Sequence, residues 1–459
     1  MKRATSWPVA SVLLAASLHA HGADLLSVYD QALQNDPQIR AADATRLAQR
    51  ESRPQALGAL LPQISGSAGI TRDQNDSSLA STLPTADNGW TTTRNWGLSL
   101  RQNVFSWQNW VALRSADHQV AQAEADYLAQ QQSLAQRVAQ QYFAVLEAQD
   151  NLRAQQAARD AYASQADEAQ QRFDVGLIAI TDVQEAKAAR DNAAAQVIAA
   201  QRALSSAGQQ LRATIGREPA ALNEPGEDMP LKSPDPADIE AWVKTSLEQN
   251  AALISSRLAA DIARDAVRSS EGGHMPTLDL VAGDTHSDVK NDFSYSTSGK
   301  SIGLQLSVPI FSGGVTQSRV RQNQYLWIAA KDRLEGTSRD TERQARDAYL
   351  GVTSDIVRVQ ALRQALESSQ TALDATQAGV NVGTRTEIDL LNSRQQLVLA
   401  QTNYSAAKYS YLNDLIALRL AAGNLDRGTL EEINRLLTVT TPPPGTPAAA
   451  PAPAATPAQ

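Results

Sequence analysis

The sequence has no cysteine among its 459 residues. Disulfides, thiolate metal sites, thiol nucleophiles and a lipid anchor on an N-terminal cysteine are therefore excluded. Aromatic residues make up only 5% of the chain, and long tracts rich in Ala and Gln indicate long helices rather than a compact α/β domain. The net charge is −8 and no block of Lys or Arg occurs, which argues against a nucleic-acid partner.

Sequence motifs for catalysis are also missing. The five histidines are spread along the chain without the spacing of metal ligands. The sequence has no glycine-rich phosphate loop and no nucleophile elbow, and acid pairs such as Glu431 and Glu432 are typical of solvated helix faces. We therefore expect that the protein is not an enzyme and that it uses no cofactor or metal.

Long hydrophobic runs are absent beyond the N-terminus. Residues 1–23 have the features of a cleaved signal peptide: Lys2 and Arg3, a short apolar segment over 9–18, and small residues before Asp24. An uncleaved anchor fits less well, because about ten apolar residues cannot span roughly 30 Å of hydrocarbon. Since no other stretch approaches the ~20 apolar residues of a membrane helix, any membrane-spanning part is expected to be a β-barrel.

Short motifs of the first half recur in the same order about 210 residues later. The pairs are LQNDPQI (33–39) with EQNAALI (248–254), LPQISGSAGI (61–70) with MPTLDLVAGD (275–284), WGLSLRQNVFS (96–106) with IGLQLSVPIFS (302–312), and VGLIAITDV (175–183) with VGTRTEIDL (382–390). The preserved order predicts one unit duplicated in tandem. After the signal peptide, the expected parts are a first repeat over 24–216, a linker over 217–236, a second repeat over 237–437 and a disordered Pro/Ala-rich tail over 438–459.

Each repeat is predicted to contain two β-strands near its start. We expect a helix over 36–58 and then strands over 64–72, 91–103, 277–286 and 300–308. In SIGLQLSVPI (301–310), large apolar residues alternate with Ser, Gly and Gln, which predicts a strand with one apolar face and one face in water. Aromatic residues beside the polar loops would lie at a membrane surface, although an ordinary soluble hairpin has similar loops. These aromatics are Trp90, Trp96, Phe293 and Tyr295.

Very long helices are predicted to follow the strands. Residues 107–173 contain neither proline nor glycine, and 315–378 contain glycine only at positions 336 and 351, which predicts helices about 100 Å long. In the return helices, apolar residues recur every seven positions, the signature of coiled coils. They are Val183, Val197, Leu204 and Leu211 in the first repeat, and Leu390, Leu397, Tyr404, Tyr411 and Leu418 in the second.

Four strands cannot close a barrel with a water-filled bore. Their unpaired edges would also leave N–H and C=O groups unsatisfied in lipid. Several copies of the chain are therefore expected to pool their strands. A non-pore periplasmic coiled-coil adaptor or surface scaffold shares the heptads, so it remains an alternative.

The chain resembles the TolC family of outer-membrane efflux proteins from about residue 25 to residue 437. The stretches that carry the resemblance are RFDVGLIAITDVQ (172–184), VNVGTRTEIDLL (380–391) and VPIFSGG (308–314). The resemblance implies a homotrimeric twelve-stranded β-barrel in the outer membrane of a Gram-negative bacterium, continued into the periplasm by a long α-helical coiled-coil tunnel. It also implies a passive exit duct for efflux or type I secretion, docked to a periplasmic adaptor and to an inner-membrane pump or ABC transporter.

The resemblance implies roles for residues of the two turns. Asp389 is expected at the pore constriction, with Asn392 where the family often has a second acid. Arg385 is expected to tie neighbouring hairpins shut through Thr181 and Asp182. The docking surface for the adaptor would consist of Val175, Gly176, Leu177, Val382, Gly383 and Thr384.

The turns also have a local physical reading. Gly176 and Gly383 are predicted to end the long helices, because glycine accepts the left-handed conformation that terminates a helix. In the trimer that the resemblance implies, Asp389 and Asn392 would give one ring of carboxylates rather than two, which predicts a cation preference weaker than that of a relative with two rings. The candidate N-caps of the return helices are Thr181 or Asp182 in the first turn and Thr384 or Thr386 in the second.

Overall fold

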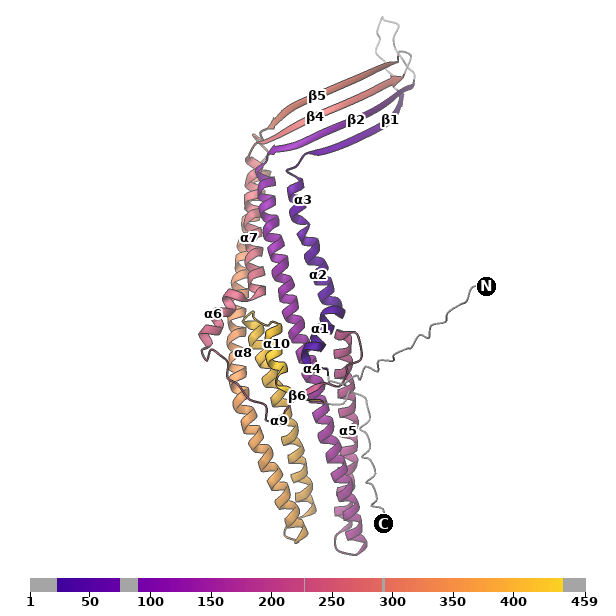
Figure 1. Ribbon diagram of the computed structural model, residues 1–459, viewed down its shortest axis with the longest axis vertical. Helices are drawn as coiled ribbons and strands as arrows, with labels where there is room; N and C mark the ends of the chain where they lie inside the picture. Colours follow the sequence, from indigo (N-terminus) through magenta and orange to yellow (C-terminus); the bar gives the residue numbers. More distant parts are fainter. Residues whose placement is uncertain (1–22, 75–89, 227, 291–293, 441–459) are drawn as a thin grey trace, which may run out of the picture.

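The computed structural model describes residues 23–74, 90–226, 228–290 and 294–440. The expected signal peptide, most of the loop between the first two strands, Phe293 and the tail from residue 441 lie outside the described residues. A β-sheet occupies one end of the molecule, long helices extend from it, and two helical hairpins end at the opposite pole (Figure 1).

The sheet has the strand order β1-β2-β4-β5, and all neighbours are antiparallel. Its strands are β1 (Gln63–Gln74), β2 (Trp90–Phe105), β4 (Thr277–Lys290) and β5 (Tyr295–Ser307). All four predicted strands are confirmed. The prediction was wrong at Val308 and Ile310, which lie beyond the end of β5, because Pro309 has no N–H for the ladder and restricts the residue before it.

The long helices are α4 (Trp107–Asp174), with 68 residues, and α8 (Val315–Asn381), with 67 residues. At 1.5 Å per residue each is about 100 Å long, as predicted. The return helix α5 (Ile180–Ile215) packs along α4, and α9 (Glu387–Ala421) packs along α8. The heptad residues of α5 are buried, and those of α9 are buried or partly buried.

Shorter helices complete the columns below the sheet. In the first half they are α1 (Leu25–Asn35), α2 (Pro37–Arg50) and α3 (Ser52–Gly58). The helix expected over 36–58 is therefore divided, and Asp36 is the N-cap of α2 rather than its first residue. In the second half, α6 (Ile239–Gln249), α7 (Ala251–Glu271) and the 3-10 turn η1 (Gly272–His274) precede β4, and α7 packs between α4 and α8.

A second small sheet lies beside the helical columns. It pairs β3 (Asn223–Pro225), from the expected linker, with β6 (Leu437–Thr440), which follows α10 (Arg427–Asn434). The first three residues of the tail that was expected to be disordered, 438–440, therefore belong to a strand. The largest apolar core lies at this level, where Tyr142 and Phe143 of α4 meet Tyr409 of α9.

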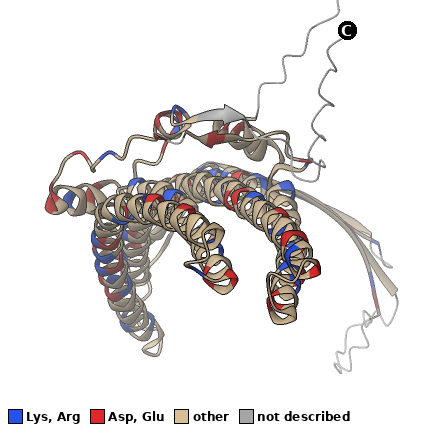
Figure 2. Ribbon diagram, turned by 90° about the horizontal axis from the view of Figure 1, so that it is seen from below, with Lys and Arg blue, Asp and Glu red and all other residues tan. Residues whose placement is uncertain are grey.

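Seen from the hairpin end, the helical columns lie along a curved layer, and the short elements lie on one side of it (Figure 2). The two corners that join strands to long helices differ. Ser106 caps α4 by accepting a hydrogen bond from Asn109, whereas Gly313 and Gly314 both adopt positive φ before α8. The first corner has Trp107 and Gln108 where the second has Gly313 and Gly314, and the two corners accordingly bend differently. Among the described residues, no helix is long and apolar enough to cross a membrane.

Candidate functional site

Both hairpin turns begin with the same helix-ending motif. In the first, Gly176 has φ of 79°, its N–H donates to the carbonyl of Phe173 at 2.8 Å, and the N–H of Leu177 donates to that of Arg172 at 2.9 Å. In the second, Gly383 has φ of 76°, its N–H donates to the carbonyl of Val380 at 3.1 Å, and the N–H of Thr384 donates to that of Gly379 at 2.9 Å. These are Schellman motifs, so the predicted role of the two glycines is confirmed.

The start of the return helix differs between the hairpins. Thr386 caps α9: its hydroxyl accepts from the N–H of Asp389 at 3.2 Å, and an Asp389 carboxylate oxygen accepts from the N–H of Thr386 at 3.0 Å. This is a capping box, so Thr386 is confirmed as an N-cap. Thr384 is not an N-cap, because its hydroxyl donates to the carbonyl of Gly379 at the end of α8.

The predicted N-cap of the first hairpin was wrong. Ala179 occupies the cap of α5 and makes no side-chain cap hydrogen bond, and Thr181 and Asp182 lie inside the first turn. The adjoining Ile178 packs against a small apolar cluster of Ala166, Ala169, Val183 and Ala186 between α4 and α5. Apolar packing, rather than a polar cap, therefore holds this turn.

Asp389 is committed to the capping box within its own chain. The backbone and side-chain hydrogen bonds from Thr386, together with the nearby charge of Arg385, hold the pKa of Asp389 below its usual value. The carboxylate therefore stays ionised at neutral pH. Asn392, the other residue predicted for the constriction, is exposed one turn further along α9.

The residues predicted to dock an adaptor form the exposed tips. The side chains of Val175, Leu177 and Val382 are at least 70% exposed, although they are apolar. The two tips lie apart in one chain (Figure 1, Figure 2), and among the described residues no hydrogen bond or ion pair joins Arg385 to Thr181 or Asp182. Arg385 packs instead against its own helix end, where a Cβ on Gly379 would lie 2.7 Å from the Arg385 Cγ.

Glu387 joins the two hairpins within the chain, and sequence reasoning missed this contact. Its carboxylate accepts from Arg172 Nη1 and from Gln165 Nε2 of α4, both at 3.0 Å. The side chains of Glu387 and Arg172 are only 13% and 27% exposed, which makes the contact stronger than a fully exposed pair. We call Glu387, Arg172 and Gln165 the hairpin clasp.

The sheet forms a second candidate site, because its two faces differ. Cross-strand register places Ile64, Leu100, Ala282 and Ile302 in one row, and the rows toward the helices add Leu280 with Leu304 and Leu278 with Leu306. The adjacent row on the opposite face is Ser65, Ser99, Gly283 and Ser301. From this row toward the helices, one face is therefore suited to hydrocarbon and the other to water. In the next row away from the helices, the apolar face also carries the ion pair of Asp284 and Lys300, beside Leu98.

Aromatic side chains flank the apolar face at both ends. Trp90 and Trp96 are about half exposed at the end away from the helices. Phe105, Trp110 and Phe311 are exposed where the strands meet the helices. An apolar band between two aromatic levels is the pattern of a surface that lies in a membrane.

Comparison with known proteins agrees with this geometry. The sequence pattern of the family described as outer membrane efflux protein matches residues 28–217 and 242–424. The chain is 34% identical over 445 residues to outer membrane protein TolC of Vibrio cholerae, which covers 96% of this chain and 99% of that protein. It is 32% identical over 440 residues to alkaline protease secretion protein AprF of Pseudomonas aeruginosa, covering 94% and 91% of the two chains.

Solved structures share the fold. The CmeC outer membrane channel of Campylobacter jejuni superposes with a TM-score of 0.76 at 20% identity, over 90% of this chain and 89% of that one. The outer membrane protein VceC of Vibrio cholerae gives a TM-score of 0.75 at 21% identity, over 87% and 96%. The resemblance read from the two turn stretches is thus confirmed, and the chain belongs to the outer membrane efflux protein family.

Proposed function

We propose that the chain is the passive exit duct of a tripartite efflux or type I secretion system. The protein is an outer-membrane channel whose helices project into the periplasm, as its family membership indicates. The observation that carries the proposal is a one-sided apolar sheet at the end of helices about 100 Å long. The family is one of transport proteins, and the non-pore scaffold left open by the heptads does not account for such a sheet.

Three copies would complete the pore. In one chain β1 and β5 form the two edges of the four-stranded sheet, and an unpaired edge is costly in lipid. Pairing β5 of one copy with β1 of the next gives twelve strands for three copies, a count that leaves a water-filled lumen. The curved layer of helices in Figure 2 suits one wall of a tunnel continuous with that barrel. The two halves of the chain would be the tandem repeat that the sequence motifs predict.

The hairpin tips would be the gate and the docking site. Neighbouring copies bring Arg385 of one hairpin toward Thr181 and Asp182 of another, and the three Asp389 carboxylates gather at the constriction. The exposed Val175, Leu177 and Val382 offer an adaptor apolar contacts, while Gly176, Gly383 and Thr384 offer backbone groups. An inner-membrane pump or ABC transporter would supply the energy.

Planar-bilayer recording of the purified full chain tests the duct. We expect discrete channels with a cation-favouring reversal potential, and a trimer that migrates faster in gels before heating than the summed mass of its chains predicts. Addition of the candidate adaptor should raise the conductance. A soluble monomer without conductance would overturn the proposal.

Replacement of Arg385 by serine tests the gate separately. An exposed arginine–carboxylate contact contributes only about 0–1 kcal/mol, so three such contacts hold a gate that opens readily. We expect Arg385→Ser to raise the resting single-channel conductance about twofold or more, whereas Arg394→Ser, on the return helix α9 that follows this turn, should leave it close to wild type. Unchanged conductance in Arg385→Ser would remove that residue from the gate.

A further inference from the structure

On the apolar face of the sheet, an acid and a base (Asp284 and Lys300) share the row of Leu98, and beyond Trp96 basic residues predominate. The next two rows toward the strand ends contain Ile70, Arg94 and Asp288, and then Arg72, Thr92 and Lys290. Arg94 is the diagonal neighbour of both Arg72 and Lys290, a relation that places Cα atoms roughly 7–8 Å apart. Long basic side chains at this spacing can reach one common ligand. We call Arg72, Arg94 and Lys290 the rim cations.

The rim cations all lie on one face of the sheet. The opposite face of the neighbouring rows carries Gly69, Asn95, Ser287 and Thr297, and then Thr71, Thr93, Val289 and Tyr295, without a lysine or arginine. Both faces of these rows are exposed or partly exposed in the single chain, so solubility alone does not explain why the cations are on one side. The three cations lie on the same face of the sheet as the apolar residues Ile64 and Leu100.

The ion pairs of the described residues do not include the rim cations. Among residues 23–74, 90–226, 228–290 and 294–440, no ion pair joins any of the three to an acidic side chain. The nearby carboxylates are engaged elsewhere: Asp288 lies 3.4 Å from His286, and Asp284 lies 3.8 Å from Lys300. Arg72 stacks over the ring of Trp90, with its guanidinium carbon 4.8 Å from the ring centre. Its N–H groups therefore remain available at the ring edge.

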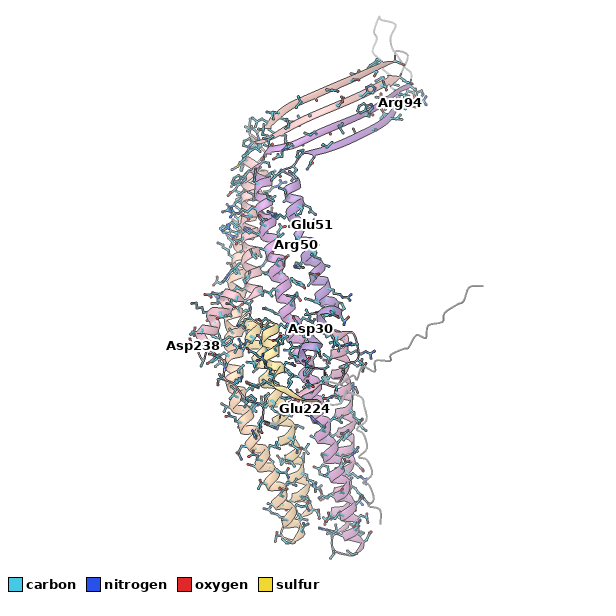
Figure 3. The ribbon with its side chains drawn as sticks, in the orientation of Figure 1. Asp30, Arg50, Glu51, Arg94, Glu224 and Asp238 are labelled. Atoms are coloured by element: carbon cyan, nitrogen blue, oxygen red, sulfur yellow. The ribbon has the colours of Figure 1, made fainter. Side chains whose placement is uncertain are left out.

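The height of the rim cations matches a lipid headgroup region. Trp96 and Phe105 mark the two aromatic levels on β2, and their separation is about 30 Å along the strand at ~3.4 Å per residue. A strand tilt of roughly 35–45° reduces this to about 23 Å, close to the ~25 Å apolar band of outer-membrane proteins. Arg94, at the far end of the sheet in Figure 3, lies just past this band on the side away from the helices. That side faces the outer leaflet when the helices are in the periplasm.

A hollow of about 400 Å³ opens beside Arg94. Ile70 and Trp96 give it apolar walls, and Arg94 and Asp288 give it polar ones. A ligand with a charged group above a hydrocarbon part fits this combination, whereas a free anion would use only the charged half.

We propose that the rim cations form a binding site for the phosphate of an anionic lipid headgroup in the outer leaflet. This inference rests on the proposed insertion of the sheet into the outer membrane. The acyl chains extend along the apolar band, and the phosphate accepts hydrogen bonds from Arg94 and its two diagonal neighbours. Each basic side chain at an anionic lipid surface multiplies affinity roughly fivefold, so three together give about a hundredfold.

The test compares three forms of the full chain. The first is wild type, the second is Arg72→Gln with Arg94→Gln and Lys290→Gln, and the third is a charge-matched control with Arg40→Gln, Arg50→Gln and Lys244→Gln. The control residues are exposed on α2 and α6, far from the sheet (Figure 3 labels Arg50). Native mass spectrometry measures lipid retained by each purified trimer after incubation with equal amounts of phosphatidylglycerol and phosphatidylcholine of identical acyl chains.

We expect wild type and the control to prefer phosphatidylglycerol by tenfold or more, and the rim variant to bind both lipids about equally. Equal binding by wild type, or an undiminished preference in the rim variant, overturns the inference. If the triple variant fails to fold, Arg94→Gln alone should lower the preference about fivefold. Retention of inorganic phosphate by wild type but not by the rim variant, with no preference between the two lipids in either, would assign the site to free phosphate and contradict the lipid assignment.

Planar-bilayer recording of the same samples separates this inference from the proposed function. If wild type forms channels but shows no lipid preference, the headgroup site is contradicted and the proposed duct is not. If wild type forms no channels, the proposed duct is contradicted, and so is the membrane insertion on which the headgroup site depends.

Discussion

The two helical hairpins share a helix-ending motif and differ in almost everything that follows it. The first turn passes through Ala179 without a polar cap and is held by an apolar cluster around Val183. The second begins its return helix with the Thr386 and Asp389 capping box. The second hairpin also supplies Glu387, which reaches across to Arg172 and Gln165 of the first.

This difference assigns unlike roles to the two hairpins. The first is held at its turn by apolar packing, and its Arg172 and Gln165 donate hydrogen bonds to the second. The second carries the polar cap of Thr386 and Asp389, together with Glu387, which reaches the first hairpin. Under the proposed function, Arg385 would act toward a neighbouring copy and Asp389 toward the lumen, and these contacts could break one at a time.

Breaking the hairpin clasp should have the largest effect. Glu387→Ala removes two hydrogen bonds to a partly buried charge and leaves Arg172 without its inter-hairpin partner. The loss of about 2 kcal/mol raises the population of separated hairpins roughly 30-fold. We expect a several-fold increase in resting conductance in planar bilayers. Glu185→Ala, an exposed acid on α5, is the matched control, and equal conductance in the two variants would deny the clasp a role.

Replacing the helix-ending glycine with alanine should destabilise the two hairpins equally. Gly176→Ala and Gly383→Ala each place a Cβ in open space, so the cost comes only from the left-handed backbone, about 1–2 kcal/mol. Hydrogen exchange at the turn amides should accelerate to a similar extent in both.

The control for the glycine pair is Gly336→Ala. Gly336 is exposed within α8 and has no atom near its Cβ position, so alanine should stabilise the helix by about 0.5–1 kcal/mol. A large difference between Gly176→Ala and Gly383→Ala would mean that the turns are not equivalent even at the helix end.

Replacing a threonine near each turn should lower stability more in the second hairpin than in the first, by a smaller amount than the changes above. Thr386→Ala removes the cap of α9 and is expected to cost about 1 kcal/mol. Thr181→Ala removes an exposed hydroxyl inside α5 and should stay within about 0.5 kcal/mol of wild type. Protease susceptibility of the two tips gives the comparison, and equal sensitivity of the two variants would contradict the assigned caps.

The smallest expected effect is a pH dependence confined to the second hairpin. The pKa of Asp389 is lowered from 3.8 by hydrogen bonds from Thr386, so its contribution to the folded turn is present above 3.8. That contribution is lost as the pH falls through the still lower folded-state pKa. Hydrogen-exchange protection of the second tip, corrected for intrinsic rates, should therefore hold at mildly acidic pH and fall below 3.8.

Asp389→Asn is the control for the pH dependence. It should remove the fall and also reduce the cation preference of the channel. An Asp389 contribution that disappears near neutral pH would show instead that crowding of three carboxylates outweighs the cap.

Several parts of the fold were predictable because local chemistry decides them. Glycine is the residue that ends a helix in the left-handed conformation, and a period of two in apolar residues specifies a strand with two unlike faces. The uninterrupted run after Trp107 specifies a long helix because it contains no breaker. The Thr386 cap was predictable as one of two alternatives, since both threonines lie near the turn.

Other parts depended on packing between distant segments. The hairpin clasp joins residues more than 200 positions apart. Heptads specify that helices lie side by side without specifying which acid meets which arginine. The start of α5 was misplaced because the apolar contact of Ile178 replaces the polar cap that Thr181 was expected to provide.

The sequence by itself determined the helix lengths, the four strands, both turn glycines and the family, since each depends on residue types within one short segment or on a motif within it. Only the tertiary structure decided that Glu387 reaches Arg172 and that Arg72, Arg94 and Lys290 share one face. Those relations depend on cross-strand register and on the rotation of one helix against another, which no local stretch encodes.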